Sequence, residues 1–173
     1  MLDSRNPGKT PPAPAEPAQL DRYDVALLAA LQRDARQSNA ELAAIIGLSG
    51  APTWRRVKRL EQLGIITGYR AEIDRRRIGL GVLAFVRIDT DSHHVDAVRT
   101  LELALAALPE VTHCHYISGA GTFELQALFT DLDAYSRWVR ERLFRLPHVK
   151  DLHTSFALGE VKTGGALPLD HLA

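Results

Sequence analysis

The chain has 173 residues, enough for one ordinary domain or two small ones. An apolar share of 46% and a charged share of 24% are typical of a globular protein and exclude a fibrous or wholly disordered one. No apolar run approaches the roughly 18 residues that cross a bilayer, and the first residues lack a secretory-signal pattern, so we expect a cytoplasmic protein. Cys114 is the only cysteine, which excludes an internal disulfide and a cysteine-rich zinc site.

Charges cancel over the whole chain but not within its two halves. Residues 20–79 hold eleven Lys and Arg against seven Asp and Glu, whereas residues 80–173 hold eight against twelve. A net charge of +4 followed by −4 is the asymmetry expected of a basic nucleic-acid-binding module joined to an acidic partner-binding module. A random scatter of charges is the alternative.

The N-terminal end has the composition of a disordered tail. Residues 1–19 hold five of the nine prolines and little apolar surface, so they cannot offset the entropy of an ordered chain. We expect ordered structure to begin at Leu20, because Asp21 is a suitable N-cap and Asp24 occupies the third position of a helix. This first helix is predicted to end near Arg33.

Two more short helices are predicted downstream. Ser38 and Glu41 form a capping box, and Gly47 can end the second helix in the left-handed conformation. Ser49 then offers another N-cap, and Pro52 falls in the first turn of a third helix, where its missing N–H does no harm. Two short helices joined by a glycine-bearing turn are a helix-turn-helix, whose second helix enters the DNA major groove.

The C-terminal half follows a different pattern, in which predicted strands alternate with two predicted helices. The strands are expected at 82–89, 111–118, 123–130 and 149–158, and the helices at 95–108 and 134–146. The order βαββαβ is that of a ferredoxin-like fold. We therefore predict an α+β protein with an N-terminal winged helix-turn-helix domain and a C-terminal ferredoxin-like βαββαβ domain.

The domain boundaries follow from these elements. Residues 67–73 are interpreted as a small β-wing, and a basic run with a change of composition follows it. The predicted segments are the tail at 1–19, the winged helix-turn-helix DNA-binding domain at 20–74, a linker at 75–81, the ferredoxin-like effector-binding and oligomerisation domain at 82–162, and a C-terminal tail at 163–173.

The third predicted helix separates apolar from basic side chains. At about 100° per residue, Trp54, Val57 and Leu60 lie on one side, and Arg55 and Arg59 lie on the other. We expect Trp54 in the core, because large apolar side chains are chiefly buried, and a base contact is the alternative. A solvated charged face is the alternative reading of the arginines, but the capping box, the glycine turn and the second N-cap favour DNA binding.

Duplex DNA is accordingly the predicted partner. Arg55 and Arg59 are expected at base edges or adjacent phosphates, and Arg56, Lys58 and Arg70 at the DNA backbone. The N-terminus of the third helix can hold another phosphate. The predicted DNA-binding residues are Ser49, Ala51, Pro52, Arg55, Arg56, Lys58, Arg59 and Arg70.

Several runs of residues together resemble the Lrp/AsnC family of feast/famine regulators. The resemblance spans about residues 20–162 and is carried by residues 20–24, 31–36, 41–43, 47–49, 55–61 and 64–66, and in the second half by 115–119, 146–149 and 160–162. It implies a sequence-specific DNA-binding transcriptional regulator. It also implies a homodimer that assembles into an octamer or larger disc, with operator binding modulated by an amino acid or a related metabolite.

The sequence departs from the family at the turn after Gly119. Relatives commonly carry acidic residues there, near the effector pocket, whereas this chain has Ala120, Gly121 and Thr122. Residues 119–122 are the candidate effector-binding turn. The open alternatives are a different ligand with an anionic group bound by a glycine-rich backbone nest, no ligand, or ligand contacts from elsewhere. A simple β-turn with glycines for backbone shape is equally open.

Metal, cofactor and catalysis are not expected. The histidines of His93-His94 and His113-Cys114-His115 do not form a metal site, because alternate residues of a strand point to opposite faces. We also find no hydrolytic triad, paired-carboxylate motif or phosphate loop, and interpret the chain as a non-enzyme. The alternatives are a heme-pathway decarboxylase, since a few relatives of the family have that activity, and a ligand- or protein-binding module without DNA binding.

Overall fold

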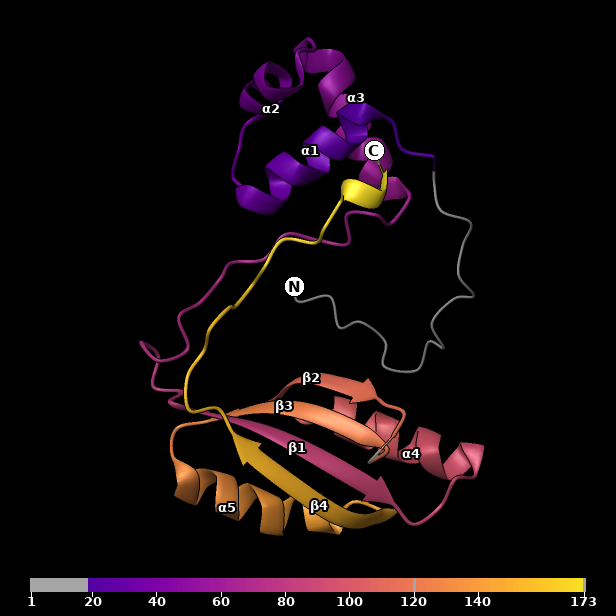
Figure 1. Ribbon diagram of the computed structural model, residues 1–173, viewed down its shortest axis with the longest axis vertical. Helices are drawn as coiled ribbons and strands as arrows, with labels where there is room; N and C mark the ends of the chain where they lie inside the picture. The colour runs from indigo at the N-terminus through magenta and orange to yellow at the C-terminus, as the bar shows by residue number, and fades with distance from the viewer. Residues whose placement is uncertain (1–18, 120, 173) are drawn as a thin grey trace. The chain divides into compact units, whose positions relative to one another are not determined.

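The structure is a computed structural model that describes residues 19–119 and 121–172 (Figure 1). The predicted disordered tail lies outside the described residues except for Gln19. The described chain forms two compact units, one of residues 19–72 with 162–172 and the other of Ile73–Val161. None of the described helices is both long and apolar enough to span a membrane.

The first unit contains three helices: α1 (Arg22–Arg33), α2 (Asn39–Ile46) and α3 (Gly50–Gln62). Asp21 caps α1 and Ser38 caps α2, each in a complete capping box. Gly47 ends α2 with φ +70°, a conformation that favours glycine. The predicted helix limits are confirmed to within two residues, because caps are local signals that the sequence carries by itself.

The core of this unit is formed by Leu27 and Ala30 of α1, Leu42 and Ile46 of α2, and Leu60 of α3. Burying these side chains against one another supplies the main stabilisation of three helices that are too short to be stable alone. Ile45, which follows the apolar pattern of α2, remains 46% exposed at the rim of this core.

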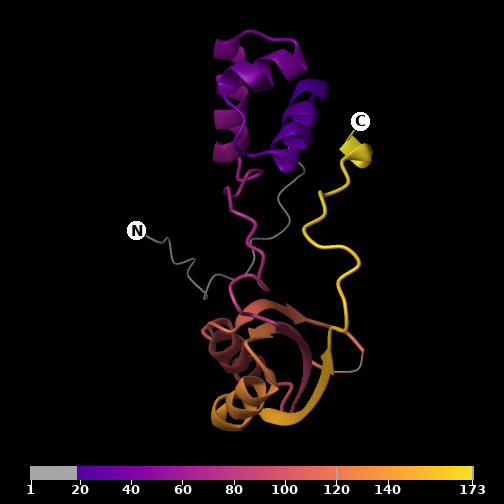
Figure 2. The ribbon, with the colours of Figure 1, turned by 90° about the vertical axis from the view of Figure 1, so that its left-hand side faces the viewer.

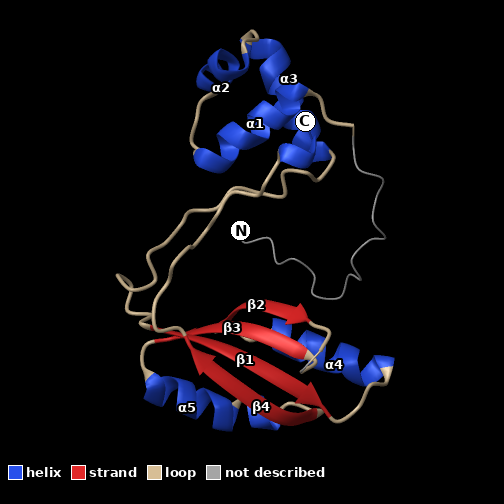
Figure 3. Ribbon diagram, viewed as in Figure 1, coloured by secondary structure: helices blue, strands red, loops and turns tan. Residues whose placement is uncertain are grey.

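The structure differs from the sequence prediction after α3. Residues 67–81 contain no strand, and the predicted β-wing is an extended segment and a turn (Figure 3). A wing needs two paired strands. Within the described chain, residues 67–73 have no neighbouring strand with which to form a ladder.

The C-terminal segment belongs to the first unit. Residues 162–172 group with the helix-turn-helix and end in the 3-10 helix η2 (Asp170–Leu172). The Gln32 side chain accepts a hydrogen bond from the Leu167 N–H at 2.6 Å and donates one to the Leu167 carbonyl at 3.3 Å. Leu169 and Leu172 are half-buried. The segment is therefore attached to α1 rather than being a free tail.

The second unit is a four-stranded antiparallel sheet with two helices. Its strands are β1 (Val82–Thr90), β2 (Val111–Tyr116), β3 (Phe123–Phe129) and β4 (Val149–Phe156), and its helices are α4 (Val95–Ala106), α5 (Leu132–Glu141) and the 3-10 helix η1 (Leu143–Arg145). The strand order β2-β3-β1-β4 confirms the predicted ferredoxin-like βαββαβ fold. Both α4 and α5 cover the same face of the sheet (Figure 2).

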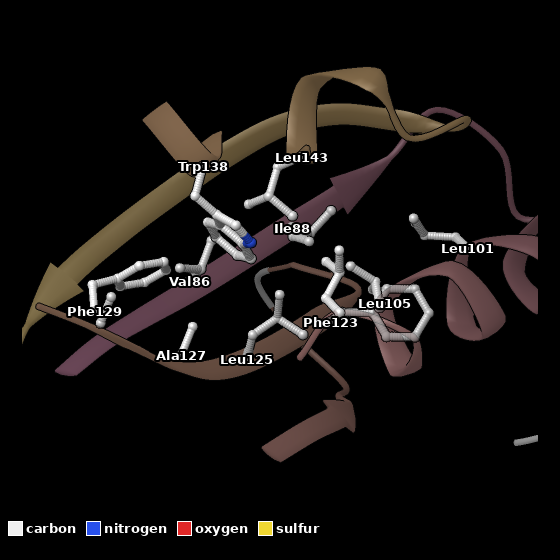
Figure 4. Close-up of a cluster of buried hydrophobic side chains, with 12 residues drawn as sticks. Val86, Ile88, Leu101, Leu105, Phe123, Leu125, Ala127, Phe129, Trp138 and Leu143 are labelled. Carbon is white, nitrogen blue, oxygen red and sulfur yellow. The ribbon is translucent and has the colours of Figure 1, made fainter. Parts of the chain in front are cut away.

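The core of the second unit lies between that face and the helices. Val86 and Ile88 of β1, Leu125 of β3 and Trp138 of α5 are at most 5% exposed (Figure 4). The alternation along β3, with every second residue buried, is what a sheet with one covered face requires. Val95, which the pattern places on the buried face of α4, is 80% exposed because it is the first residue of that helix.

No helix of this unit covers the opposite face of the sheet, which we call the open face. Leu83 and Phe85 of β1 and Leu128 of β3 lie on it: Leu83 pairs with Leu128, Phe85 pairs with Gln126, and none of the three packs against the core. All three are half-exposed. The open face therefore combines apolar side chains with the charged and polar side chains of Arg87, Asp89, His113, His115, Glu124, Gln126, Asp151, His153 and Ser155.

Candidate nucleic-acid interface

The outward face of α3 is a single stripe of exposed side chains. Its members follow one another at the spacings of a helical face and are Ala51, Trp54, Arg55, Lys58 and Gln62. The inward face holds the buried Thr53 and Leu60, with Val57 half-buried between them. The Thr53 hydroxyl can be buried because it donates to the Ser49 carbonyl at 2.9 Å. The outward stripe is the surface that α3 can present to a partner.

Arg55 is the predicted contact that the structure leaves most available. Its side chain is exposed, and within the described part of the chain it has no hydrogen-bond or ion-pair partner. A free guanidinium at the middle of an exposed helix face can donate to a guanine edge or to phosphate oxygens.

Lys58 is also on the outward stripe but already has a partner. Its ammonium lies 2.6 Å from a carboxylate oxygen of Glu61, and this hydrogen bond is the main cause of the lowered pKa of Glu61. The Tyr69 hydroxyl donates to the other Glu61 oxygen at 3.1 Å. Lys58 is 47% exposed, so an exchange of this partner for a phosphate would cost little.

Arg56 and Arg59 lie on the side of α3 that faces α1. Their guanidinium groups bind the two oxygens of Asp24, at 2.8 Å from Arg56 and 3.0 Å from Arg59. Arg56 also bonds Asp21 at 2.8 Å, and Arg59 donates to the Gln19 carbonyl at 3.1 Å. Asp24 is only 1% exposed. A buried carboxylate needs such partners, so the two arginines fix α3 against α1.

The prediction of a buried Trp54 is wrong, since its side chain is 55% exposed. The spacing of apolar residues placed Trp54, Val57 and Leu60 on one face of this helix and Arg59 on the opposite face. Asp24 binds Arg59 and draws its guanidinium toward α1, although the Arg59 side chain stays 47% exposed, and Trp54 lies on the outward stripe. The signal that could have revealed this is Asp24 itself, because it precedes Leu27 and Leu31 at helical spacing on the buried stripe of α1.

The remaining predicted residues surround the start and the end of α3. Ser49 is the N-cap of α3 but its side chain makes no capping hydrogen bond. Ser49 and Ala51 are exposed and Pro52 is half-buried. Arg70 is exposed in the extended segment after α3. Ser49 and Ala51 therefore lie at the exposed start of the helix, Arg55 lies one turn further along it, and Arg70 lies beyond its end.

The candidate effector turn joins β2 to β3 in the second unit. Gly119 and Gly121 have φ of +104° and +90°, conformations that require glycine, and Ala120 lies outside the described residues. Thr122 is 7% exposed. Its N–H donates to the Ile88 carbonyl at 2.8 Å and its hydroxyl accepts from the Thr90 N–H at 3.4 Å, so the Thr122 side chain holds the turn onto β1.

Arg87 is a residue near this turn that the sequence reasoning missed. Its side-chain carbons would lie 3.6 Å from a Cβ at Gly121, and its guanidinium binds the Glu124 carboxylate at 3.0 Å. The side chain is 52% exposed on the open face. It is the positive charge that the structure brings beside the turn, through pairing of β1 with β3.

The histidines and the cysteine of β2 do not converge. His113 and His115 lie on the open face with their rings 6.3 Å apart, while Cys114 faces the core. Burial raises the pKa of the Cys114 thiol to about 11, with a contribution from Glu102. Asp89, Asp151 and His153 gather elsewhere on the open face with one ligand atom each within 4.8 Å, and such exposed acidic groups are common without an ion.

Two family profiles match the chain. Residues 20–67 match a winged helix-turn-helix DNA-binding domain, and residues 83–167 match the Lrp/AsnC ligand binding domain. The chain is 36% identical over 168 residues to the leucine-responsive regulatory proteins of Escherichia coli and Salmonella typhimurium, covering 96% of this chain and 97% of those proteins. The protein of the same name from Serratia marcescens is 37% identical.

Solved structures agree with these matches. A transcriptional regulator from Neisseria meningitidis in complex with L-Met has a TM-score of 0.85 and 36% identity, covering 89% of this chain and 99% of that one. An AsnC family regulator from Agrobacterium tumefaciens has a TM-score of 0.84 and 30% identity, covering 89% and 100%. The chain therefore belongs to the Lrp/AsnC family and is a transcriptional regulator with a helix-turn-helix DNA-binding domain and a ligand-binding domain.

Proposed function

We propose that the outward stripe of α3 reads operator DNA and that Arg55 is its principal polar contact. The observation that carries this proposal is the exposed, unpartnered guanidinium of Arg55 on a helix held rigidly from behind by Asp24. Ser49 and Ala51 lie where the first turn of α3 meets a phosphate, and Lys58 and Arg70 supply charge to the DNA backbone. Arg56 and Arg59 act chiefly by positioning α3.

The test is the salt dependence of duplex binding by the full chain, measured by fluorescence anisotropy on duplexes selected from a random pool. Arg55→Ala should weaken binding about 5- to 150-fold, the range for a lost bidentate base contact. Lys58→Ala should weaken binding to all sequences and lower the salt slope by about 1. Arg137→Ala, an exposed arginine of α5, is the control and should change neither. Equal binding by Arg55→Ala and wild type would refute the assignment.

We propose a homodimer that pairs the open faces of two sheets. Leu83, Phe85 and Leu128 supply apolar area on that face, and Arg87 with Asp151 and His153 supplies charges of both signs. A two-fold axis through such a face brings the same surface of the two subunits into contact. The dimer would carry two α3 helices, which would enter successive major grooves of a pseudo-palindrome roughly 34 Å apart. Assembly of such dimers into an octamer is the further step implied by the family.

We propose that a small molecule bound near residues 119–122 modulates DNA binding. The matched ligand-binding profile covers this turn, and the Neisseria meningitidis regulator holds L-Met. The turn offers the backbone of Gly119 and Gly121 rather than carboxylates, and Arg87 lies beside it. This combination favours a ligand with a carboxylate, such as an amino acid or a related organic acid.

A thermal-shift screen of amino acids and organic acids tests the effector. A ligand at about 100 times its dissociation constant stabilises the folded protein by about 2.7 kcal/mol. Arg87→Gln should reduce that shift, measured against the melting temperature of the same unliganded variant, because it removes the positive charge beside the turn. A shift that is unchanged in Arg87→Gln would place the ligand elsewhere.

We propose no catalytic role, because the matched relatives are named regulatory proteins and the site described above is a helix face rather than a set of reacting groups. Because the protein binds DNA, we expect it in the cytoplasm.

A further inference from the structure

Trp54 is the largest apolar side chain on the outward stripe of α3. It is 55% exposed, whereas Trp138, the other tryptophan of the chain, is 5% exposed in the core of the second unit. Exposed large aromatic side chains leave apolar area in contact with water and are enriched where a partner later covers them. The neighbours of Trp54 indicate what kind of partner that is.

An open hollow of about 490 Å³ lies beside the indole. Gly50, Ala51, Trp54 and Arg55 of α3 line it together with Asn39 at the start of α2. The Asn39 side-chain amide donates to the Gly50 carbonyl at 2.8 Å, which fixes the wall of the hollow. A Cβ at Gly50 would lie only 3.2 Å from that amide nitrogen, so glycine permits the close approach of the two helices.

The chemistry of this hollow is mixed in a specific way. Ala51 and Trp54 are apolar, while Arg55 beside them and Lys58 one turn further along α3 are cationic. A duplex presents phosphates along its backbone and, at the edges of its bases in the major groove, one apolar group, the C5-methyl of thymine. Two apolar side chains flanked by two cationic ones, on a helix that enters the major groove, match this combination of methyl groups and phosphates.

We propose that Trp54, with Ala51, recognises thymine methyl groups in the major groove and is a specificity-determining residue of the operator contact. The inference rests on the proposed docking of α3 in that groove. Arg55 supplies the polar half of the readout, and the indole packs on the methyl group at the adjacent base pair. Contact of Trp54 with a second copy of the chain is the competing use of the same exposed surface.

The experiment compares one duplex in two forms. A duplex enriched from a random pool by the wild-type protein is prepared with thymine or with uracil, which lacks only the C5-methyl group. Wild type should bind the thymine form about fourfold more tightly for each contacted methyl, the ratio that corresponds to burial of one methylene-sized group. Trp54→Ala should lose most of that preference, and Trp54→Phe should keep it.

Two controls isolate the contact. Leu63→Ala removes a 49% exposed apolar side chain at the end of α3, outside the stripe, and should keep the full preference. Any effect of uracil on the shape of the duplex acts equally on wild type and Trp54→Ala. The ratio of thymine to uracil binding measured with Trp54→Ala is therefore the baseline for wild type. Acrylamide quenching gives a direct readout, because the thymine duplex should shield Trp54 while Trp138 is already buried.

The possible outcomes separate the two proposals. Wild type that does not distinguish thymine from uracil, or Trp54→Ala that distinguishes them as well as wild type, overturns the assignment of Trp54. Shielding of Trp54 by self-association in the absence of DNA overturns it in favour of a contact between copies. A random pool from which no duplex is enriched overturns the proposed docking of α3 itself.

Discussion

At the scale of single residues, Asp24 connects the start of one helix to the orientation of another. Its carboxylate accepts from the Asp21 N–H at 3.3 Å and completes the capping box of α1, and the same two oxygens bind Arg56 and Arg59. An α1 residue thus determines which arginines of α3 face inward. Arg55 and Trp54 face outward as a consequence.

Replacement of Asp24 by asparagine should destabilise the helix-turn-helix unit. Asn keeps the shape and part of the cap but leaves Arg59 without a counter-charge and Arg56 with Asp21 alone. We expect the free energy of unfolding to fall by about 2 kcal/mol, below the value for a wholly buried pair because both arginines are partly exposed. Urea denaturation followed by circular dichroism measures the change.

The matched control is Asp34→Asn, which alters an exposed carboxylate that bonds only the nearby Arg36 N–H. Its effect on stability should stay within about 0.5 kcal/mol. Equal stability of the two variants would mean that Asp24 contributes only a helix cap. Below its melting temperature Asp24→Asn should also bind duplex DNA more weakly, because the direction of Arg55 depends on the fixed orientation of α3.

At the scale of elements, the C-terminal segment is a component of the DNA-binding unit. The side-chain amide of Gln32 on α1 bonds both the N–H and the carbonyl of Leu167. Leu167, Leu169 and Leu172 line a cavity of about 1240 Å³ together with Leu28 and Leu31 of α1. A segment that follows the last strand of the second unit thus packs on the helices of the first unit.

Gln32→Ala should release this segment. Loss of the two hydrogen bonds is expected to cost about 1 kcal/mol, because both are near the surface. Hydrogen exchange at the Leu167 amide should accelerate, and proteolysis of residues 162–172 should become faster, while the remainder of the chain stays protected. Gln62→Ala, an exposed glutamine of α3, should leave both measurements unchanged. If hydrogen exchange at the Leu167 amide is as fast in wild type as in Gln32→Ala, the two hydrogen bonds between Gln32 and Leu167 are not formed in solution.

At the scale of the whole molecule, the sheet has one face covered by helices and one open face. Antiparallel sheets can leave a face to water, but half-exposed Leu83, Phe85 and Leu128 together are more apolar than a solvated face requires. The paired-sheet homodimer proposed above would bury them.

Phe85→Asp should convert that dimer to monomers. Burial of an unpaired carboxylate at the centre of the contact is strongly unfavourable, whereas the same side chain in a monomer stays in water. Size-exclusion chromatography with light scattering should show the mass fall by half. Val95→Asp, a substitution at an 80% exposed position of α4, should keep the mass of wild type. A dimer that persists in Phe85→Asp would locate the contact on another surface.

The sequence by itself determined the helices and strands and their order, apart from the wing after α3. Asp21, Ser38 and Gly47 mark helix ends through bonds within three or four residues, and alternation of buried residues marks the strands. Such signals act locally and do not depend on the remainder of the chain. They also sufficed for the Lrp/AsnC resemblance and for the helix-turn-helix.

Only the tertiary structure decided which side of α3 faces outward and which residues pack behind it. Trp54 is exposed, and the Arg59 guanidinium reaches toward α1 because a buried carboxylate 35 residues earlier in the chain binds it. The segment around Leu167 returns to α1 through a bond that spans 135 residues. Interactions over such separations depend on where the fold brings distant residues together, and periodicity along one helix carries no record of them.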